Sequence, residues 1–486
     1  MSEEIRKLEP QSVWGHFADL NSVPRPSKKE EKVQAFMIDF AKSQGLEWKQ
    51  DEIGNILVSK PASPGMEDRR KVVLQAHLDM VCQKNKDTDF DFETQGINMY
   101  VDGDWVKAKG TTLGADNGIG VASAMAVFSS KDIVHPPIEA LFTTDEEAGM
   151  TGAHHLQPGF LSGDILMNLD TEDDDELSIG CAGGIDTDVS WSYEEEATNT
   201  EELAFSVKVS GLFGGHSGMD IIYGRGNANK ILNRMIYDPS ESFGWSISNF
   251  EGGGLRNAIP REAEAVVILP ANKADEAEEY WQELGQALVK EFATTDPNIV
   301  IKVDKVELPK SKMINNDFQA FTAALQCTHD GIRRMSPDVE DLVETSNNVA
   351  HVSLAEGKMS LKALQRSDRE SAKFDMADSI GAPWRLLGAE VEHSGSYPGW
   401  KLDPNAPMLG MMKELYEELF KEEPRVLACH AGLECGLLGQ HYPELEMISF
   451  GPTIKNPHSP DEKVNIASVG KFWGYFLEAL KRVPKS

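Results

Sequence analysis

The chain has 486 residues, 40% of them hydrophobic, and its 79 acidic and 47 basic residues give a formal net charge of −32. A chain of this length can bury a sizeable core in two or three domains. The negative charge disfavours nucleic acid and anionic membranes as partners. Residues 1–7 lack the apolar segment of a signal peptide, no apolar run reaches the length of a membrane span, and the five scattered cysteines disfavour a disulfide framework. We therefore expect a cytoplasmic protein.

The first 80 residues alternate between helical and strand-like patterns. Predicted helices cover residues 12–20 and 27–45, and predicted strands cover residues 54–58 and 72–77. Ser27 and Glu30 have the spacing of a capping box at the start of the second helix. Alternation of this kind is typical of an α/β domain whose functional side chains lie at the carboxyl ends of its strands.

His77 and Asp79 stand at the end of the second of these strands. If the strand continues through both residues, the two side chains lie on one face. Imidazole is a good zinc ligand, and a nearby carboxylate can orient its ring. Taken alone the His-x-Asp pattern is weak, and a histidine with satisfied hydrogen bonds at a strand end is the more ordinary interpretation.

A glycine-rich turn, residues 111–120, places Asp116 ahead of an alanine-rich helix over residues 121–128. Glycine lets the backbone turn tightly, so Asp116 is expected to face outward at the start of the helix. A plain turn or helix-capping aspartate is the ordinary alternative. A phosphate-binding loop is disfavoured, because no lysine follows the glycines.

Acidic residues follow two further strands. A strand over residues 138–143 leads to Glu146 and Glu147, and another strand ends at Asp170. Adjacent side chains at a strand end point in different directions, so one of the two glutamates can bind a metal while the other acts as a base. The acidic run from Asp170 to Glu176 is expected to be mostly solvated surface.

The pattern changes after the glycine-rich stretch 180–184, which we interpret as a flexible boundary, and changes back at a hinge over residues 395–399. Strands are predicted near residues 204–209, 245–250, 263–268, 299–303, 349–354 and 359–364, with helices near 228–237, 274–292, 408–420 and 466–481. We therefore expect an α/β catalytic domain of residues 1–186 and 397–486, with a mixed sheet flanked by helices. Residues 187–396 are expected to form an inserted α+β domain.

Candidate ligands recur at strand ends and glycine turns. They are His77, Asp116, Glu147, Asp170 and His458. Two imidazoles and three carboxylates are about what two divalent ions need, with one carboxylate bridging both. Nitrogen and oxygen ligands without thiolate suit zinc, cobalt or manganese. The residues thus indicate a two-metal hydrolase, with a non-catalytic metal-binding protein as the alternative from another class.

Longer motifs resemble those of a known family. They are Gln75-Ala-His-Leu-Asp-Met-Val81, Gly110-Thr-Thr-Leu-Gly-Ala-Asp-Asn-Gly-Ile-Gly120, Glu146-Glu-Ala-Gly149, Gly180-Cys-Ala-Gly-Gly-Ile-Asp186, Gly214-Gly-His-Ser-Gly218, Arg256-Asn-Ala-Ile-Pro-Arg-Glu262, Tyr397-Pro-Gly-Trp400, His430-Ala-Gly-Leu-Glu-Cys-Gly436, Gly451-Pro-Thr453 and His458-Ser-Pro-Asp-Glu462. With them the chain resembles the dinuclear zinc exopeptidases that carry an inserted lid domain, and more closely the bacterial cytosolic, carnosinase-like aminoacyl-histidine dipeptidases. Residues 305–350 carry little of the resemblance.

The resemblance implies a role for each candidate. His77 and Asp170 would bind one metal, Glu147 and His458 the other, and Asp116 would bridge the two, with a cis peptide bond after it. Asp79 would orient His77, and Glu146 would be the general base. The metals implied are two divalent ions, zinc by preference, with cobalt or manganese as alternatives.

The inserted lid would supply residues for the substrate. The resemblance implies that His216 stabilises the oxyanion and that Asn257 and Arg366 hold the substrate, although by its local sequence Arg366 is better interpreted as a surface arginine. The implied activity is hydrolysis of Xaa-His dipeptides such as β-alanyl-histidine. An N-acyl-amino-acid amidohydrolase, or a broader di- or tripeptidase, remains the alternative among enzymes. A small peptide is thus the expected partner, and a homodimer stays open, because in related enzymes with smaller lids a partner subunit supplies the lid histidine.

Overall fold

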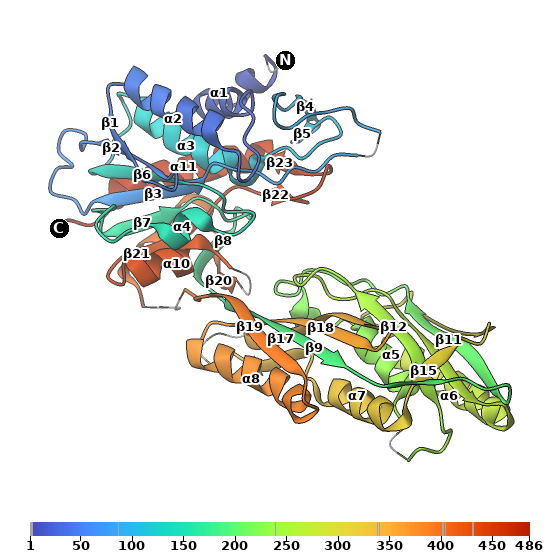
Figure 1. The fold of residues 1–486 in the computed structure, drawn as a ribbon. Helices are drawn as coiled ribbons and strands as arrows, with labels where there is room; N and C mark the ends of the chain where they lie inside the picture. Colours follow the sequence, from blue (N-terminus) through green and yellow to red (C-terminus); the bar gives the residue numbers. More distant parts are fainter. Residues whose placement is uncertain are drawn as a thin grey trace. The chain divides into compact units, whose positions relative to one another are not determined.

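The computed structural model describes residues 3–85, 87–238, 240–337, 339, 341–400, 403, 405–429 and 432–486, and they fall into two compact units (Figure 1). The first unit comprises Met1–Gly180, Trp400–Ala428 and Leu433–Ser486, and the second comprises Cys181–Gly399 and Cys429–Gly432. The expected insert, residues 187–396, lies inside the long segment of the second unit. The exact domain boundaries stay a prediction.

The first unit is built on a mixed sheet whose strand order is β1-β2-β6-β3-β7-β21-β8-β20. The strands are β1 (Glu47–Gln50), β2 (Ile56–Lys60), β3 (Val72–His77), β6 (Ile138–Thr143), β7 (Ile165–Asn168), β8 (Glu176–Cys181), β20 (Arg425–Cys429) and β21 (Glu446–Ser449). The central strands β6, β3, β7 and β21 are parallel, and β1, β2 and β8 pair antiparallel. Strands β3, β6 and β7 are buried along their whole length, because helices cover both faces of a parallel sheet.

Helices of the first unit come from both ends of the chain. They are α1 (Gln11–Leu20), α2 (Glu31–Ser43), α3 (Ala115–Ser129), α4 (Thr151–His155), α9 (Pro407–Phe420), α10 (Glu434–His441) and α11 (Ile466–Arg482). Helices α2 and α3 pack on β1, β2 and β3, while α9 packs on β21 and α11. A single apolar cluster joins these elements. A small sheet, β4 (Met99–Asp102), β5 (Trp105–Ala108), β22 (Ile454–Lys455) and β23 (Lys463–Asn465), was not predicted.

The second unit is an antiparallel sheet in the order β14-β11-β13-β12-β17-β18-β9-β19, with β16 beside β17 and a separate β10-β15 pair. Its strands are β9 (Gly183–Ser192), β10 (Glu195–Ala197), β11 (Glu202–Ser210), β12 (Ser246–Gly253), β13 (Ala263–Pro270), β14 (Val300–Val306), β15 (Ser311–Met313), β16 (Gly331–Met335), β17 (Val343–Ala355), β18 (Lys358–Ser367) and β19 (Glu390–Tyr397). Helices α5 (Ala228–Ile236), α6 (Ala274–Glu291), α7 (Asn315–Cys327) and α8 (Glu370–Leu386) pack against it over one apolar core. The expected fold class, a mixed α/β sheet with an α+β lid, is confirmed, although α7 and α8 were not predicted.

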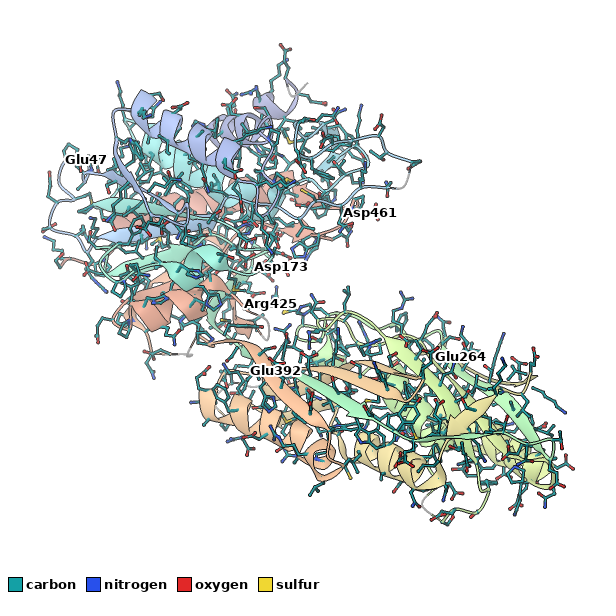
Figure 2. The ribbon with its side chains drawn as sticks, viewed as in Figure 1. Glu47, Asp173, Glu264, Glu392, Arg425 and Asp461 are labelled. Carbon is teal, nitrogen blue, oxygen red and sulfur yellow. The ribbon has the colours of Figure 1, made fainter. Side chains whose placement is uncertain are left out.

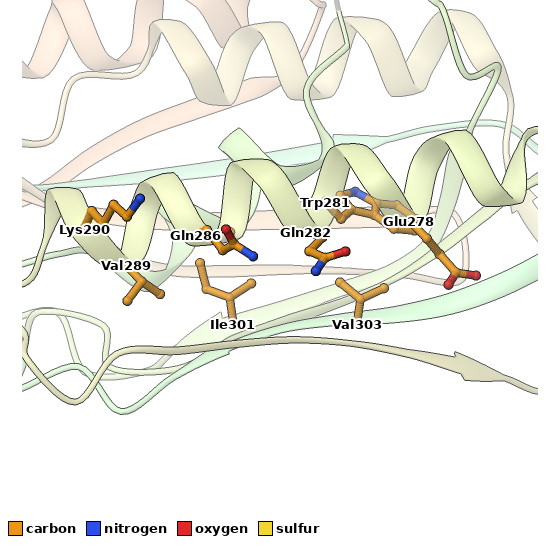
Figure 3. A pocket seen from close by; sticks show the side chains of 9 residues that line it. Glu278, Trp281, Gln282, Gln286, Val289, Lys290, Ile301 and Val303 are labelled. Atoms are coloured by element: carbon orange, nitrogen blue, oxygen red, sulfur yellow. The ribbon is translucent and has the colours of Figure 1, made fainter.

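Trp281 shows how a helix of the second unit is held on the sheet. Its indole is buried, stacks on Trp245 at a centroid distance of 5.1 Å and donates to the carbonyl of Met235. A shallow groove remains between α6 and the edge strand β14, with Ile301 and Val303 in its wall (Figure 3). It brings polar and apolar side chains together without the donor sets expected of a metal site.

Two local predictions are wrong. Ser27 and Glu30 make no capping box, since α2 begins at Glu31 without a side-chain cap. The glycines of residues 180–184 are not a flexible link, because they lie buried in β8 and β9. The acidic run after Asp170 stays partly exposed, as expected: Asp175 pairs with Arg425 at 2.7 Å at the surface, and Asp173 also lies beside Arg425 (Figure 2). Of the motif at residues 430–436, residues 430 and 431 lie outside the described residues, and its last three residues begin helix α10.

Candidate metal centre

Neighbouring parallel strands bring the candidate ligands to one edge of the sheet in the first unit. Strand β3 ends at His77, Glu146 and Glu147 follow β6, and Asp170 follows β7. Strand β3 lies between β6 and β7 and pairs with both in parallel. Because the carboxyl ends of parallel strands meet at the same edge, residues nearly a hundred positions apart become neighbours.

Asp116 lies between two histidines. Its Oδ1 is 3.1 Å from Nε2 of His77, and its Oδ2 is 3.2 Å from Nε2 of His458. Asp170 Oδ1 lies 3.5 Å from the same nitrogen of His77, and Glu147 Oε2 lies 3.0 Å from that of His458. Two donor groups, each of three residues, therefore share Asp116. This is the arrangement of a carboxylate that can bridge two cations.

The turn before α3 presents Asp116 to this centre. Asp116 and Asn117 lie within the bounds of α3, but both have non-helical backbone angles. The peptide bond between them is cis, as the resemblance implied. His458 reaches the centre from the segment between β22 and β23 and has a φ of 59°, in the left-handed region that a non-glycine residue rarely adopts.

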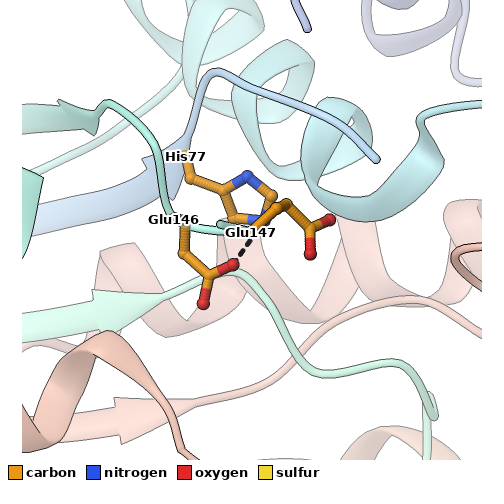
Figure 4. A group of neighbouring side chains, drawn as sticks. All are labelled: His77, Glu146 and Glu147. Atoms are coloured by element: carbon orange, nitrogen blue, oxygen red, sulfur yellow. Dashed lines mark ion pairs between the residues drawn. The ribbon is translucent and has the colours of Figure 1, made fainter. Parts of the chain in front are cut away.

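Glu146 and Glu147 are held by Asp79 through their backbone. The N–H of Glu146 donates to Asp79 Oδ1 at 3.0 Å, and that of Glu147 donates to Oδ2 at 3.1 Å. Asp79 Oδ1 also lies 3.4 Å from Nδ1 of His77, although the strand itself ends at His77. Figure 4 shows the two glutamate side chains diverging beside the imidazole, with Glu146 Oε2 4.0 Å from Nε2 of His77. By distance alone Glu146 can therefore serve as a ligand or as a base.

The close acids and imidazoles shift one another's pKa. Burial, reinforced by Asp116, raises the pKa of Glu147 to about 7. Hydrogen bonds to Asp116 and Glu147 raise the pKa of His458 to about 11. Burial alone lowers the pKa of His77, but Asp170 and Asp116 outweigh it, so that the net shift is upward. These upward shifts favour the protonated imidazoles, and a bound metal ion would compete with those protons for the same nitrogens.

The donor set fits divalent cations. Within the described part of the chain, Glu147 Oε1 is buried and receives no hydrogen bond, so this oxygen has an unsatisfied lone pair inside the centre. Buried carboxylates are stable when they are paired or bind a metal. Imidazole nitrogen and carboxylate oxygen, without sulfur, are donors that zinc, cobalt and manganese accept. The described groups of three or more potential ligands all lie in the first unit.

Sequence reasoning missed several supporting contacts of this centre, most of them made by buried residues. Ser27 donates to Asp79 Oδ2 at 2.8 Å, and Glu30 accepts the N–H of Asp145 at 2.8 Å, so the supposed capping pair instead supports the acids of the site. Glu434 accepts from Gln75 at 2.6 Å and from Thr143 at 2.7 Å beneath the strand ends. The spacing of these residues along the chain does not indicate that they contact one another.

The lid candidates lie in the second unit and are described there by themselves. His216 Nδ1 accepts the N–H groups of Gly218 and Met219 at 3.2 and 3.0 Å, which assigns the ring proton to Nε2 and makes that nitrogen a donor. Asn257 is exposed, and its carbonyl accepts the N–H of Ser217 at 2.8 Å.

Arg366 is not a surface arginine. It lies on β18 with only 4% of its surface exposed and donates from Nη1 to the hydroxyl of Tyr397 at 2.9 Å. Among the described residues its Nε finds no acceptor. A buried guanidinium with an unused donor is suited to a carboxylate of a ligand.

Fold and centre together define a metal-dependent hydrolase with an inserted lid. The chain belongs to peptidase family M20/M25/M40, whose model matches residues 73–482. It is 44% identical over 484 residues to the cytosol non-specific dipeptidase of Escherichia coli, covering 99% of each chain. It is also 44% identical to the aminoacylhistidine dipeptidase of Vibrio alginolyticus, whose crystal structure it matches with a TM-score of 0.90 over 100% of both chains. Human carnosine dipeptidase 1, at 13% identity and a TM-score of 0.51 over 96% of each chain, shares the fold.

The described helices include none that is both long and apolar enough to cross a membrane. Of the cysteines whose side chains are described, Cys82, Cys181, Cys327 and Cys435, none forms a disulfide. Both findings agree with the composition.

Proposed function

We propose that this protein is a cytoplasmic dipeptidase that hydrolyses Xaa-His dipeptides, such as β-alanyl-histidine, with two divalent metal ions, zinc by preference. The observation that carries the proposal is the position of Asp116, with one carboxylate oxygen facing His77 and the other facing His458. The names of the relatives from Escherichia coli and Vibrio alginolyticus support dipeptides as the substrate class. A homodimer stays a prediction.

In this proposal His77 and Asp170 hold one ion, Glu147 and His458 hold the other, and Asp116 holds both. When bound, the ions supply Lewis-acid activation of water and of the scissile carbonyl. Asp79 keeps the imidazole of His77 in its ligating orientation through the contact at Nδ1. Each of these roles is a prediction about a side chain that lies in the donor cluster.

Glu146 acts as the general base. Its carboxylate takes a proton from the attacking water as the carbon–oxygen bond forms, and it gives that proton to the leaving amine as the carbon–nitrogen bond breaks. Burial raises the pKa of Glu146 well above its ordinary value. A raised pKa suits this shuttle, because the carboxylate then accepts the proton readily near neutral pH.

The lid residues act on the substrate. The Nε2–H of His216 donates to the oxygen that becomes negative in the transition state. Asn257 hydrogen-bonds to the peptide, and the guanidinium of Arg366 binds the terminal carboxylate of the dipeptide. The preference for histidine rests on the family resemblance and on the name of the Vibrio alginolyticus relative, while the Escherichia coli relative is named a non-specific dipeptidase, and none of the described residues singles out an imidazole.

A substrate panel on the metal-reconstituted protein tests the proposal. The panel compares β-alanyl-histidine, glycyl-histidine, a dipeptide with a C-terminal alanine, β-alanyl-histidine amide, a tripeptide and N-acetyl-histidine. We expect the two Xaa-His dipeptides to have the highest kcat/KM and the amide to be at least about 10-fold poorer, a loss of about 1.4 kcal/mol of transition-state binding. Equal rates for all dipeptides would show that the enzyme is a dipeptidase without preference for histidine. Faster cleavage of N-acetyl-histidine would contradict the proposal and indicate an amidohydrolase.

A further inference from the structure

The backbone N–H groups of the turn that carries Asp116 are hydrogen-bonded to a buried carboxylate. Glu462, only 2% exposed, accepts four consecutive backbone N–H groups. Its Oε2 accepts from Leu113 at 2.7 Å and Gly114 at 3.0 Å, and its Oε1 accepts from Ala115 at 2.7 Å and Asp116 at 3.3 Å. Consecutive N–H groups that converge in this way form a concave anion site. Here the anion is a side chain of the protein itself.

A backbone carbonyl of the same turn accepts a hydrogen bond from a buried guanidinium. Arg25, 1% exposed, donates to the carbonyl of Gly114 at 2.5 Å. Its other terminal nitrogen donates to the carbonyls of Leu78 and Asp79 at 3.1 and 3.0 Å. One guanidinium therefore joins the end of the His77 segment to the Asp116 turn. Asn21 accepts a further hydrogen bond at 3.0 Å and orients the guanidinium.

Two glycines of the Asp116 motif make room for this arginine. Gly114 has a φ of 69°, and a Cβ there would run into the guanidinium of Arg25 and the sulfur of Met80. A Cβ on Gly118 would lie 2.8 Å from Nη2 of Arg25. The glycine spacing is thus explained by the close approach of Arg25 and not by a ligand.

Glu462 is also tied to the second histidine of the centre. It lies four positions after His458, and its own N–H donates to the carbonyl of Ser459 at 3.0 Å. The short segment that presents His458 therefore also holds the turn that presents Asp116. A shift of either segment would change the separation between the His458 imidazole and the Asp116 carboxylate.

We propose that Arg25 and Glu462 are positioning residues that hold the 113–116 turn between them and so keep Asp116 between His77 and His458. The inference rests on the proposed function, in which Asp116 serves both ions. Buried groups that orient ligands typically contribute 10–100-fold to metal affinity. In either orientation of its amide, Glu462→Gln would set an NH₂ donor against two of these four N–H groups and displace the turn.

The test is cobalt titration of Glu462→Gln and Arg25→Lys beside the wild type. Visible absorption of bound cobalt reports ligand geometry, and the titration gives affinity and stoichiometry. We expect both variants to bind the ions about 10–100-fold more weakly and with an altered spectrum. The control is Glu139→Gln, a buried acid that accepts from Lys71 and Ser162 near the amino end of β6. It should lose stability but keep the wild-type spectrum and affinity.

The outcomes separate this inference from the proposed function. If the wild type binds two ions and cleaves dipeptides while both variants bind cobalt like the wild type, only the positioning role is wrong. If Glu139→Gln weakens binding as much as Glu462→Gln, the effect is general destabilisation and the inference is overturned. Loss of the native circular dichroism spectrum in both variants would overturn it as well, since the pair would then be needed for the fold. A wild type that binds no pair of ions contradicts the proposed function.

Discussion

At the scale of single residues, Glu146 and Glu147 show how neighbours in sequence acquire different surroundings. Both donate their N–H to Asp79, which places their side chains on diverging paths. Glu147 then contacts His458 at 3.0 Å, whereas Glu146 stays 4.0 Å from His77. The contact with His458 favours Glu147 as a ligand, whereas the distance of Glu146 from His77 allows either role, and its role as the base comes from the family resemblance.

Substitution of each glutamate by glutamine separates the two roles. We expect Glu146→Gln to keep nearly full metal content and to lower turnover by roughly 10²–10⁴-fold, the usual contribution of a general base. Glu147→Gln should lose metal, because an amide oxygen is a weaker ligand than a carboxylate. Metal content by plasma emission and kcat on a dipeptide measure both effects. Retention of metal by Glu147→Gln together with its loss from Glu146→Gln would reverse the assignment.

At the scale of secondary-structure elements, a chain of buried side-chain hydrogen bonds crosses the sheet below the centre. Gln75 on β3 accepts from Asn168 on β7, which in turn accepts from Ser449 on β21. Ser449 also meets the hydroxyl of Thr171 at 2.7 Å. Strands β3, β7 and β21 are thereby linked by side chains as well as by the backbone.

Ser449→Ala tests the contribution of this chain. The substitution leaves the Asn168 and Thr171 oxygens without Ser449 in a dry environment, so we expect a loss of about 1–3 kcal/mol in the free energy of unfolding. Urea unfolding of the metal-loaded protein measures it as a lower midpoint. Ser59→Ala, in the half-buried part of β2, is the matched control and should change stability by less than about 0.5 kcal/mol. Equal midpoints for the two variants would show that the chain adds nothing.

At the scale of the whole molecule, the two units have separate apolar cores, and they differ in their content of candidate metal ligands. The first holds the clustered acids and histidines, and the second has its own core between its sheet and helices α5 to α8. Metal binding stabilises only the unit that contains the ligands, because a ligand shifts the unfolding equilibrium of the structure that it binds. We therefore expect the unit that holds these acids to be the less stable of the two when the metal ions are removed.

Calorimetry with and without metal tests this asymmetry. Removal of the ions by a chelator should lower the unfolding temperature of one transition and leave the other in place. With free metal at 100 times Kd, the stabilisation lost is about 2.7 kcal/mol. His77→Ala, which lacks a ligand, should behave like the chelated wild type and respond little to added metal. An equal shift of both transitions would mean that the units unfold as one.

Much of the fold was predictable from local pattern. Apolar runs placed β3, β6 and β7, and periodic residues placed α6, α9 and α11. The strands predicted near residues 349–354 and 359–364 lie in β17 and β18. Most of residues 305–350 was not predictable. Helix α7 lies there, but it is only partly buried and has no side-chain cap to mark its start. The short β4, β5, β22 and β23 were missed because pairs of such length depend on partners far along the chain.

The sequence by itself indicated the candidate ligands: His77, Glu147 and Asp170 follow apolar runs, and the carboxyl ends of parallel strands meet at one edge of a sheet, while Asp116 and His458 lie in glycine-containing or turn segments of the matching motifs. Only the tertiary structure decided how these side chains are held. Ser27 and Glu30 support the acids of the centre instead of capping α2, and Arg25 and Glu462 reach the Asp116 turn from positions about 90 residues before it and about 350 after it. The physical reason is that a buried charge takes whichever partner the folded chain brings within hydrogen-bond distance, and that partner leaves no periodic mark in the sequence.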